Sequence, residues 1–528
     1  FGDVVVADHR ETWPLRSGGF RKWLTYAYFE QEGGAPNSEA MGSALRVVEA
    51  KAQFDAPERE VFVRIGNSDG VIYIDIGDAS WRAIEIDATG WRIVEWPPVR
   101  FRRSRGMLPL PIPVAGGSIR SLRDLLNVKA DHDFVLVVAF LIAALRGAGP
   151  YPVMALSGEQ GSAKSTFSRL LRALIDPNTS PLRSLPRDDR DLFIAASNGF
   201  VIAFDNISTM PNWLSDTLCR LATGGGFATR QLHTDQDEIL FDATRPIILN
   251  GVEGVVTRPD LADRALLIDL AVIPEDKRLT EAHVLRRFER DRPLILGALL
   301  DAVSTGIRNL PTTALSRMPR MADFALWGAA CEREFWPAGT FMAAYGANLA
   351  AANDVIIESD VLSTAVIRLM SGTSEWRGPA STLYEALSVP LTDAQRRDGR
   401  WPKAPNALSG KLKRIAPPLR KVGIVIEFPG RKNQTREIII SKLAESAGQR
   451  PSPSSRPSPT SEIRYRRNGL VGDDLGDDLD DCENVITNIV TPKSLILSGN
   501  NDGDDRDDLL PSYSGRPRSP YQIAKDGE

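Results

Sequence analysis

A glycine-containing loop, set between an apolar run and an amphipathic segment, is the feature that most restricts how this chain can fold. The run is "YPVMALS", the loop is "GEQGSAKST" at 158–166, and the segment after it is "FSRLLRALI". This succession predicts a buried strand, a tight loop and a helix. Glycines in such a loop let backbone N–H groups converge on phosphate oxygens, and the helix N-terminus adds positive potential. The sequence therefore predicts an α/β protein that binds a nucleotide.

The chemistry expected of this loop is that of ATP with Mg²⁺. Lys164 would reach the β- and γ-phosphates, and the Ser165 hydroxyl would ligate the metal. Ala163 stands where glycine is usual, and its methyl group is tolerable if the φ angle there is already helical. A chance match is the alternative, and the strand–loop–helix context weighs against it. The predicted nucleotide-binding residues are Gly158, Glu159, Gln160, Gly161, Ser162, Ala163, Lys164, Ser165 and Thr166.

Two later apolar runs end in side chains suited to the same chemistry. "GFVIAFDN" ends in Asp205 and Asn206, and "RPIILN" ends in Asn250. An acid at the end of a strand beside the loop can hold Mg²⁺ through water, so Asp205 joins Ser165 as a predicted metal residue. Asn250 is suited to orienting an attacking water. A strand that ends in Asp is a weak signal by itself, and the loop upstream strengthens it.

An arginine that would act between subunits comes from "GVEGVVTRPDLADRALLIDL". Arg264 ends a short predicted helix, and it could stabilise charge on a γ-phosphate that a neighbouring subunit holds. Arg258 competes for this role. The alternative is a surface ion pair between Arg264 and Asp260 or Asp263. The predicted catalytic set is Lys164, Asp205, Asn250 and Arg264.

Composition limits the class of protein. A chain of 528 residues predicts two to four domains, and 42% hydrophobic with 25% charged residues is typical of a soluble globular protein. The three cysteines and four histidines are scattered, which argues against a disulfide framework or a metal centre built from them. The longest apolar run, "FVLVVAFLIAAL", has twelve residues, whereas a bilayer requires about 20. We therefore expect a cytoplasmic protein with no membrane segment.

Changes in pattern divide the chain into five predicted regions. Short alternating strands and a helix indicate an α+β domain at 1–125, and apolar strands alternating with helices indicate the nucleotide-binding core at 126–278. Residues 279–361 are helix-like. Residues 362–442 combine helices with two late strands, and the Ser/Pro-rich and acidic tail at 443–528 is predicted to be disordered because it carries too little apolar surface to fold.

Two segments are candidates for contact with DNA. The first, "ATRQLHTDQDEILFDATRP", reads as a hairpin with Arg230 and His233 near its tip, but the acids that follow would repel phosphate. A structural hairpin at a subunit interface is the alternative.

The second segment, 401–441, holds nine basic and two acidic residues, a local charge of +7. Its order of helix, strand, basic turn and strand predicts a winged helix, in which the helix enters a groove and the wing meets phosphates. A solvated surface with scattered cations is the alternative. The predicted DNA-binding residues here are Lys411, Lys413, Arg414, Arg431 and Lys432.

Taken in this order, the motifs resemble the AAA+ ATPases, specifically the MCM-like and superfamily-3-like replicative helicases of phages and integrative elements. "AKS" at the end of the loop, "FDN" as the second nucleotide motif, Asn250 as the first sensor and Arg264 as the arginine finger carry the likeness. It runs from about residue 15 to 442 and is strongest from 150 to 275. The resemblance implies a hexameric, ATP-dependent helicase that acts on single-stranded or forked DNA. Proteins of this group often carry a primase segment, whereas this chain shows no primase signature. The alternatives are that the segment is lost, removed, or encoded elsewhere as a primase partner.

One departure from that family concerns hydrolysis. Its second nucleotide motif usually ends in Asp-Glu, whereas Asn206 follows Asp205 here, and an amide cannot take a proton. Either another carboxylate, such as Glu159 or Glu253, is the base, or hydrolysis is slow. The departure favours an alternative function, a nucleotide-switched DNA-binding initiator or scaffold. A translocase that moves on duplex DNA shares every motif.

Overall fold

The computed structural model describes residues 1–225, 227–230, 238–241, 243–251, 255–256, 258–397, 399, 401–429, 431–432 and 435–443, with the backbone alone at 227–230, 238–241, 431–432 and 435–436. His233, Glu253 and the predicted tail beyond Leu443 lie outside these ranges.

A parallel four-stranded sheet forms the centre of the core. Its order is β10–β13–β9–β14, and every neighbouring pair is parallel. The strands are apolar and buried, as expected for a sheet covered on both faces. The predicted α/β core is therefore confirmed. Its strands are β9 (Val153–Ser157), β10 (Ile202–Ile207), β13 (Ile247–Gly251) and β14 (Ala265–Asp269), and its connecting helices are α5 (Lys164–Ile175), α6 (Asp189–Asn198), α7 (Asn212–Thr223) and α8 (Pro259–Ala262).

The long apolar run predicted as a buried helix is α4 (Asp131–Leu145), whose side chains are almost all buried. It packs against α9 (Glu281–Asn309), α10 (Ala322–Cys331) and α11 (Thr340–Ser359). None of the helices in the described ranges has the length and apolarity that crossing a bilayer demands. The short elements nearby are α3 (Arg120–Arg123), η1 (Glu275–Lys277), η2 (Leu310–Thr312) and η3 (Glu332–Glu334).

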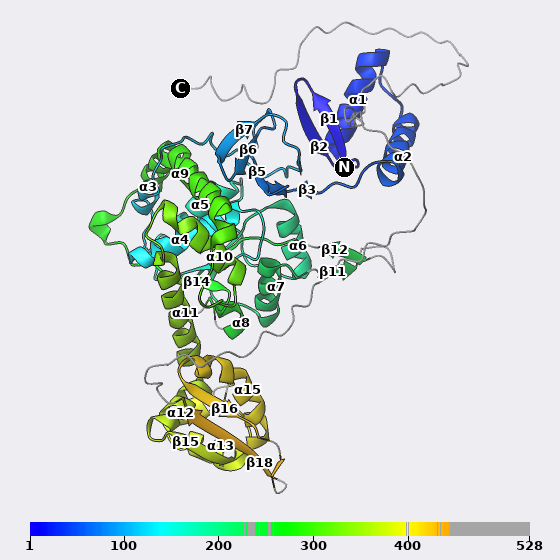
Figure 1. Cartoon of the computed structure of the whole chain (residues 1–528). Helices are drawn as coiled ribbons and strands as arrows, with labels where there is room; N and C mark the ends of the chain where they lie inside the picture. Colours follow the sequence, from blue (N-terminus) through cyan, green and yellow to red (C-terminus); the bar gives the residue numbers. More distant parts are fainter. Residues whose placement is uncertain are drawn as a thin grey trace, which may run out of the picture.

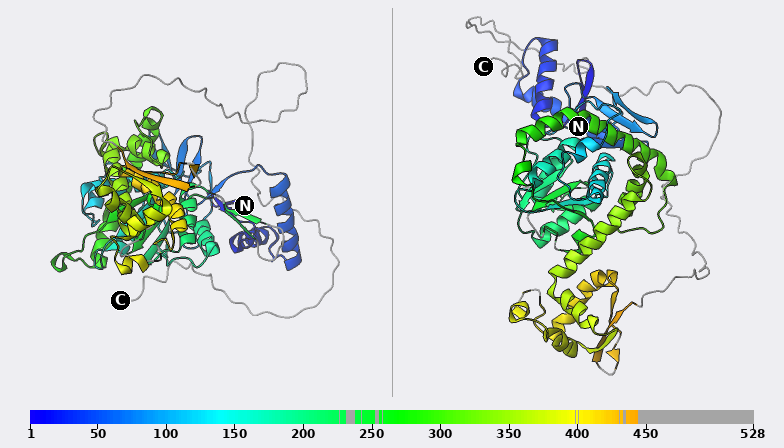
Figure 2. Two further views of the ribbon diagram at one scale, coloured as in Figure 1. Left: turned by 90° about the horizontal axis from the view of Figure 1, so that it is seen from below. Right: turned by 90° about the vertical axis from the view of Figure 1, so that its left-hand side faces the viewer.

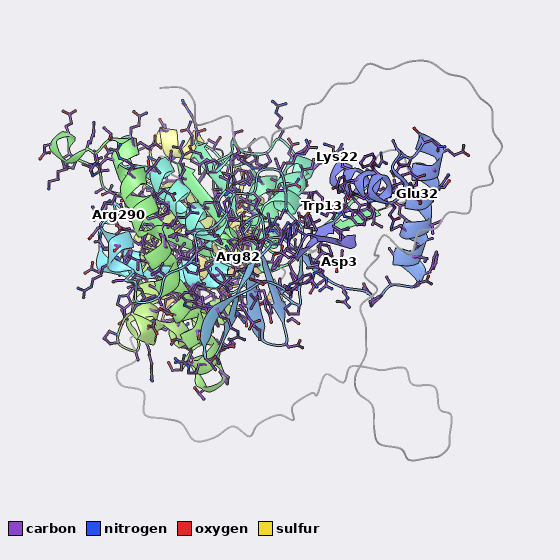
Figure 3. All side chains as sticks on the ribbon, turned by 90° about the horizontal axis from the view of Figure 1, so that it is seen from above. Asp3, Trp13, Lys22, Glu32, Arg82 and Arg290 are labelled. Carbon is purple, nitrogen blue, oxygen red and sulfur yellow. The ribbon has the colours of Figure 1, made fainter. Side chains whose placement is uncertain are left out.

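The N-terminal region consists of two parts with different cores. A hairpin of β1 (Gly2–Val6) and β2 (His9–Trp13) packs on α1 (Gly18–Glu32) and α2 (Ser38–Phe54) around a small core of its own, to one side of the main body (Figures 1 and 3). The antiparallel meander that follows, of β4, β5, β6 and β7, shares the hydrophobic core of α4 and α9. The predicted division at 125 and 278 remains a prediction about folding units. The remaining strands are β3 (Val61–Phe62), β4 (Ile65–Ser68), β5 (Val71–Asp75), β6 (Ala83–Asp87), β7 (Gly90–Val94) and β8 (Arg100–Phe101).

A buried ion pair joins this meander to the nucleotide-loop helix. The Arg64 side chain is fully buried, and its Nε donates to Oδ1 of Asp176 at 3.1 Å. Its Nη2 also donates to the Leu108 carbonyl at 2.7 Å. Asp176 follows the last residue of α5 and accepts hydrogen bonds from the backbone N–H groups of Phe200 and Val201. The far end of α5 is therefore fixed to the N-terminal sheet.

The C-terminal region lies at the opposite end of the core from α1 and α2 (Figures 1 and 2). Its antiparallel sheet has the order β15–β18–β16, and it packs on three helices to form a separate core. The predicted late helix and two late strands are present, whereas the first strand, β15, was not predicted. The elements are α12 (Val361–Ser371), β15 (Glu375–Pro379), α13 (Ala380–Ser388), α14 (Asp393–Arg397), α15 (Pro405–Lys421), β16 (Ile424–Glu427), β17 (Arg431–Lys432) and β18 (Thr435–Lys442).

Candidate nucleotide site

The loop between β9 and α5 contains a strained alanine. Ala163 precedes the first helical residue with φ 64° and ψ 30°, which is left-handed backbone. The methyl group was expected to be tolerable if the φ angle of Ala163 were already helical. This condition is not met. For a residue with a Cβ this conformation costs about 1–2 kcal/mol, and such strain tends to occur at functional sites.

Lys164 is held by the loop itself. Its Nζ donates to the carbonyl oxygens of Gly158 at 2.6 Å and Glu159 at 2.9 Å. Burial lowers the pKa of Lys164, and the nearby carboxylates of Asp205 and Asp269 act in the opposite direction. The ammonium group thus lies inside the loop, among carbonyl groups with which a bound phosphate would compete.

Ser165 and Asp205 meet at the edge of the sheet. The Ser165 hydroxyl donates to Oδ1 of Asp205 at 2.9 Å, although 40 residues separate them in the chain. The two come together because the loop follows one parallel strand and Asp205 lies near the end of another. A hydroxyl and a carboxylate oxygen are the ligand types that Mg²⁺ prefers, and this ion normally keeps several waters and phosphate oxygens besides. These two residues therefore fit the metal predicted for the site.

Asn250 links the helix after the loop to the end of β10. Its Oδ1 accepts from the backbone N–H of Asn206 at 3.0 Å, and its Nδ2 donates to the Ser168 hydroxyl at 3.0 Å. β13 lies between β9 and β10, so the side chain is almost fully buried between the two strand ends. One N–H and one lone pair of the amide remain for a further partner such as water.

The backbone explains why asparagine suits position 206. Asn206 is exposed and has φ 57°, and the register of β10 with β13 shifts between Phe204 and Ile207. Asparagine is one of the few residues that enter this left-handed conformation readily. A glutamate at this position would have to adopt the same unfavourable φ. Of the carboxylates suggested as a base, Glu159 is exposed on the loop.

Arg264 forms the ion pair that was its alternative interpretation. Its Nη1 donates to Oδ1 of Asp260 at 2.6 Å, and 17% of its side chain is exposed. Arg258 pairs with Asp216 at 2.9 Å. Each of these arginines thus already has a carboxylate partner within the single chain.

A third arginine extends this group. Arg320 pairs with Asp260 at 2.7 Å and with Asp263 at 3.1 Å, and it was not predicted. Asp263 also accepts from Lys421, at the end of α15, at 2.6 Å. The arginine predicted to act between subunits is therefore connected through ion pairs to the C-terminal region.

Two residues beside the loop were missed. Nδ2 of Asn127 donates to the carbonyl oxygens of Ser162 at 3.1 Å and Ala271 at 2.5 Å, and no local sequence pattern marks it. Asp269, at the end of β14, accepts from the Ser157 hydroxyl at 3.2 Å and pairs with Lys129. The signal that identified Asp205, an acid at the end of an apolar strand, could have identified Asp269 too.

The basic helix α15 presents only part of its predicted set to solvent. Lys413, Arg414 and Arg420 are exposed, whereas Lys411 is half-buried with its Nζ 3.5 Å from the Gly399 carbonyl. Lys411 is therefore less accessible than Lys413 and Arg414. The predicted hairpin is present as a pairing of β11 (Phe227–Arg230) with β12 (Glu238–Phe241). The side chains of three predicted DNA-binding residues lie outside the described part of the chain, namely Arg230, Arg431 and Lys432.

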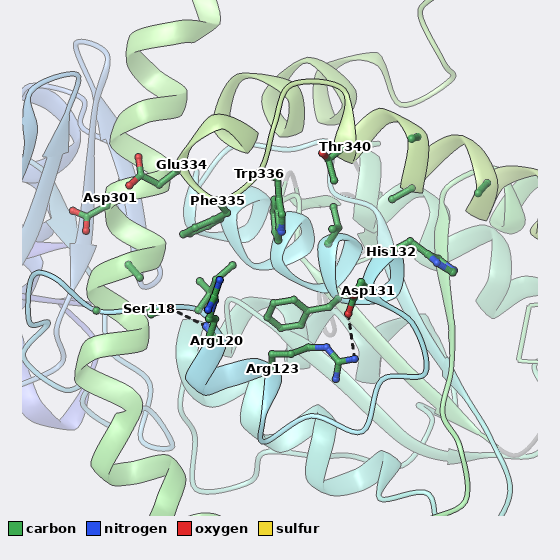
Figure 4. Close-up of a pocket in the computed structure, with 18 residues that line it drawn as sticks. Ser118, Arg120, Arg123, Asp131, His132, Asp301, Glu334, Phe335, Trp336 and Thr340 are labelled. Carbon is green, nitrogen blue, oxygen red and sulfur yellow. Dashed lines mark hydrogen bonds and ion pairs between the residues drawn. The ribbon is translucent and has the colours of Figure 1, made fainter.

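A separate cavity of about 790 Å³ lies between α4, α9 and α11, with Trp336 on its wall (Figure 4). None of the loop residues 158–166, all of which the structure describes, lines it. Arg123 pairs with Asp131 at 3.5 Å, and Asp301 accepts from the Trp91 indole at 2.9 Å. Burial raises the pKa of Asp301. The cavity is not part of the candidate nucleotide site.

Comparison with known protein families gives two matches along the chain. The family described as "Actinomycete integrative conjugative element replication protein" matches residues 119–355, and the "AICE RepA C-terminal domain" matches 362–457. The two matches cover 237 and 96 residues, together 333 of 528. The core thus matches the replication-protein model, and the C-terminal region matches the model of its C-terminal domain. The match identifies a replication protein of an integrative conjugative element. The predicted association with mobile-element replication is therefore confirmed.

Solved structures show more distant likenesses to this replication protein. The apo A form of the NrS-1 C-terminal region has 13% identity and a TM-score of 0.37, with 80% of this chain and 91% of that chain covered. JCV helicase with a bound acetamide ligand has 13% identity and a TM-score of 0.22, with 44% and 72% covered. A comparison with curated proteins gave no match.

Proposed function

We propose that this replication protein is an ATP-dependent DNA helicase or translocase that works as a homo-oligomeric, hexameric ring. The observation that supports this most is the 2.9 Å contact between Ser165 and Asp205, directly beside Lys164. It provides the lysine, hydroxyl and carboxylate that ATP and Mg²⁺ require in one place. A separate primase would complete the replication apparatus.

In this proposal the chain's own residues divide the work. Lys164 binds the outer phosphates, Ser165 and Asp205 hold Mg²⁺, and Asn250 orients water with its remaining N–H or lone pair. Bound Mg²⁺ supplies neutralisation of charge on the phosphate oxygens. Arg264 contributes from the neighbouring subunit. For this it must break its ion pair with Asp260 and bind the phosphate instead. The C-terminal region acts as a winged helix, with the exposed cations of α15 against DNA phosphates.

A second function, a nucleotide-switched DNA-binding initiator or scaffold, is favoured by one specific observation. Asn206 stands where the resembling helicases have the glutamate that activates water, and its backbone favours asparagine. Because an amide cannot accept the proton, this chain would bind ATP and DNA and hydrolyse slowly.

ATP turnover and strand displacement on a forked DNA separate the two functions. For the helicase we expect DNA-stimulated turnover that Lys164→Ala abolishes, whereas the exposed and remote Lys51→Ala variant stays at the wild-type level. Arg264→Ala should keep ATP binding and lose turnover. Tight ATP and DNA binding with negligible turnover in the wild type would select the initiator. Full turnover by Arg264→Ala would exclude the site shared between subunits.

A further inference from the structure

The segment after β14, residues 270–278, lies along the nucleotide loop. The backbone N–H of Leu270 donates to the Ser157 carbonyl at 2.9 Å, and that of Ile273 donates to the Gly161 carbonyl at 3.3 Å. Asn127 connects the same two stretches through Ser162 and Ala271. Two direct hydrogen bonds and the two that Asn127 donates, four in all, thus align this segment with the loop.

Two glycines of the loop make this close approach possible. A Cβ atom at Gly158 would lie 2.7 Å from the Leu270 carbonyl oxygen, which is too close for any side chain. A Cβ atom at Gly161 would lie 3.1 Å from Nη2 of Arg278. Both glycines also have positive φ, at 147° and 85°. The Arg278 guanidinium therefore lies directly against the backbone of the loop.

The bonds that Arg278 makes hold its guanidinium in place while leaving donors available. Its Nε donates to the Ile273 carbonyl at 3.1 Å. Within the described ranges, the one carboxylate that pairs with it is that of Glu275, at the long distance of 3.9 Å. About half of the side chain, 49%, is exposed. Its Nη groups thus retain N–H donors next to Gly161, and the planar fork of arginine matches phosphate geometry.

We propose that Arg278 is a further nucleotide-binding residue, which contacts the phosphate chain of the ATP held by its own subunit. This inference rests on the proposed ATP binding and extends it. Arg278 acts within the subunit, unlike Arg264, which would act across the interface. The left-handed φ of 85° at position 161 favours glycine there, and the absent side chain leaves room for the guanidinium beside the loop.

The test compares ATP and adenosine binding to the full-length chain by calorimetry. We expect Arg278→Gln to weaken ATP binding roughly tenfold or more, because a hydrogen bond to a charged group is lost, and to leave adenosine binding unchanged. Arg278→Lys keeps the positive charge but loses the planar guanidinium. Its ATP affinity should therefore lie between those of the wild type and Arg278→Gln. Arg286→Gln, at an exposed arginine on α9, should match the wild type.

The possible outcomes separate this inference from the proposed function. Wild-type ATP affinity in both Arg278 variants would overturn the inference alone. An equal loss of ATP and adenosine binding would show that Arg278 only supports the loop, and would overturn it too. A wild-type chain that binds no ATP would overturn both the inference and the proposed function. If Arg278→Gln fails to fold, the Lys variant decides by the same comparison.

Discussion

The two ends of the core are joined to their neighbouring regions in opposite ways. The N-terminal meander is fixed by Arg64 and Asp176, whose side chains are 0% and 1% exposed, inside a continuous hydrophobic core. The C-terminal region is joined through Lys421 and Asp263, whose side chains are 48% and 27% exposed, and through a buried hydrogen bond from Asn353 to the Pro418 carbonyl at 3.2 Å. Breaking a buried ion pair costs about 3–5 kcal/mol, whereas an exposed pair contributes about 0–1 kcal/mol.

This difference indicates which joint can rearrange during function. The buried joint fixes the N-terminal sheet to the helix that follows the nucleotide loop. The exposed ion pair of Lys421 with Asp263 can break at little cost, and Asp263 shares Arg320 with Asp260, the partner of Arg264. Opening it would therefore alter the ion pairs around the proposed intersubunit arginine.

The largest expected effect comes from breaking the buried joint. Asp176→Ala leaves the Arg64 guanidinium buried without its carboxylate, so the free energy of unfolding should fall by about 3–5 kcal/mol. Urea denaturation measures this. Asp263→Ala at the exposed joint is the matched control, with an expected loss of about 1 kcal/mol or less. Equal losses in the two variants would remove the distinction between the joints.

The next effect concerns DNA bound by the helix at the exposed joint. Replacing both Lys413 and Arg414 with Gln should weaken binding to a short duplex roughly tenfold and reduce the slope of log affinity against log salt by about two. Lys411→Gln is the control, because that side chain is half-buried and should contribute little. Fluorescence anisotropy over a salt series measures both. A larger loss with Lys411→Gln would make Lys411, and not the exposed pair, the main DNA contact of α15.

A smaller effect is expected at the strained start of α5. Ala163→Gly relieves left-handed backbone that costs about 1–2 kcal/mol, and the added freedom of the unfolded chain offsets part of the gain. We expect the free energy of unfolding to rise by about 0.5–1 kcal/mol. Ala350→Gly, at an exposed position within α11, should lower it by about 1 kcal/mol. Destabilisation by both changes would mean that the alanine at 163 is not strained.

The smallest effect on stability belongs to Lys421. Lys421→Met should change the free energy of unfolding by less than about 1 kcal/mol, because the exposed pair with Asp263 contributes little. Proteolysis between the core and the C-terminal region should nevertheless become faster, since the joint opens more often. Lys403→Met, an exposed lysine elsewhere in the same region, is the control. Unchanged proteolysis would show that the ion pair of Lys421 with Asp263 does not maintain the joint.

Local patterns predicted the central features of the site. The buried strand, the loop and the helix after it, together with strand ends at Asp205 and Asn250, all follow from sequence neighbours. The parallel order of the strands then brings Asp205 to Ser165. The β15 strand was missed because "EWRGP" has neither strict alternation nor an apolar run.

The parts that could not be predicted depend on distant contacts or on exact dihedral angles. Asn127 and Arg278 reach the loop only because separate segments pack beside it. The left-handed φ of Ala163 contradicts the usual preference of alanine, so composition alone could not reveal it. The ion pair of Arg264 with Asp260 was one of the predicted alternatives. That Arg320 also pairs with Asp260 could be seen only in the folded chain.

The attachment of α5 determines how the loop can respond to a ligand. With Asp176 held by Arg64, the helix cannot slide along its axis without exposing a charge to an apolar interior. A rearrangement caused by phosphate would therefore spread sideways, through Asn250 to the end of β10 and through residues 270–278. Under the proposed function, the N-terminal sheet would then serve as a stationary frame, and movement would occur on the opposite side of the molecule.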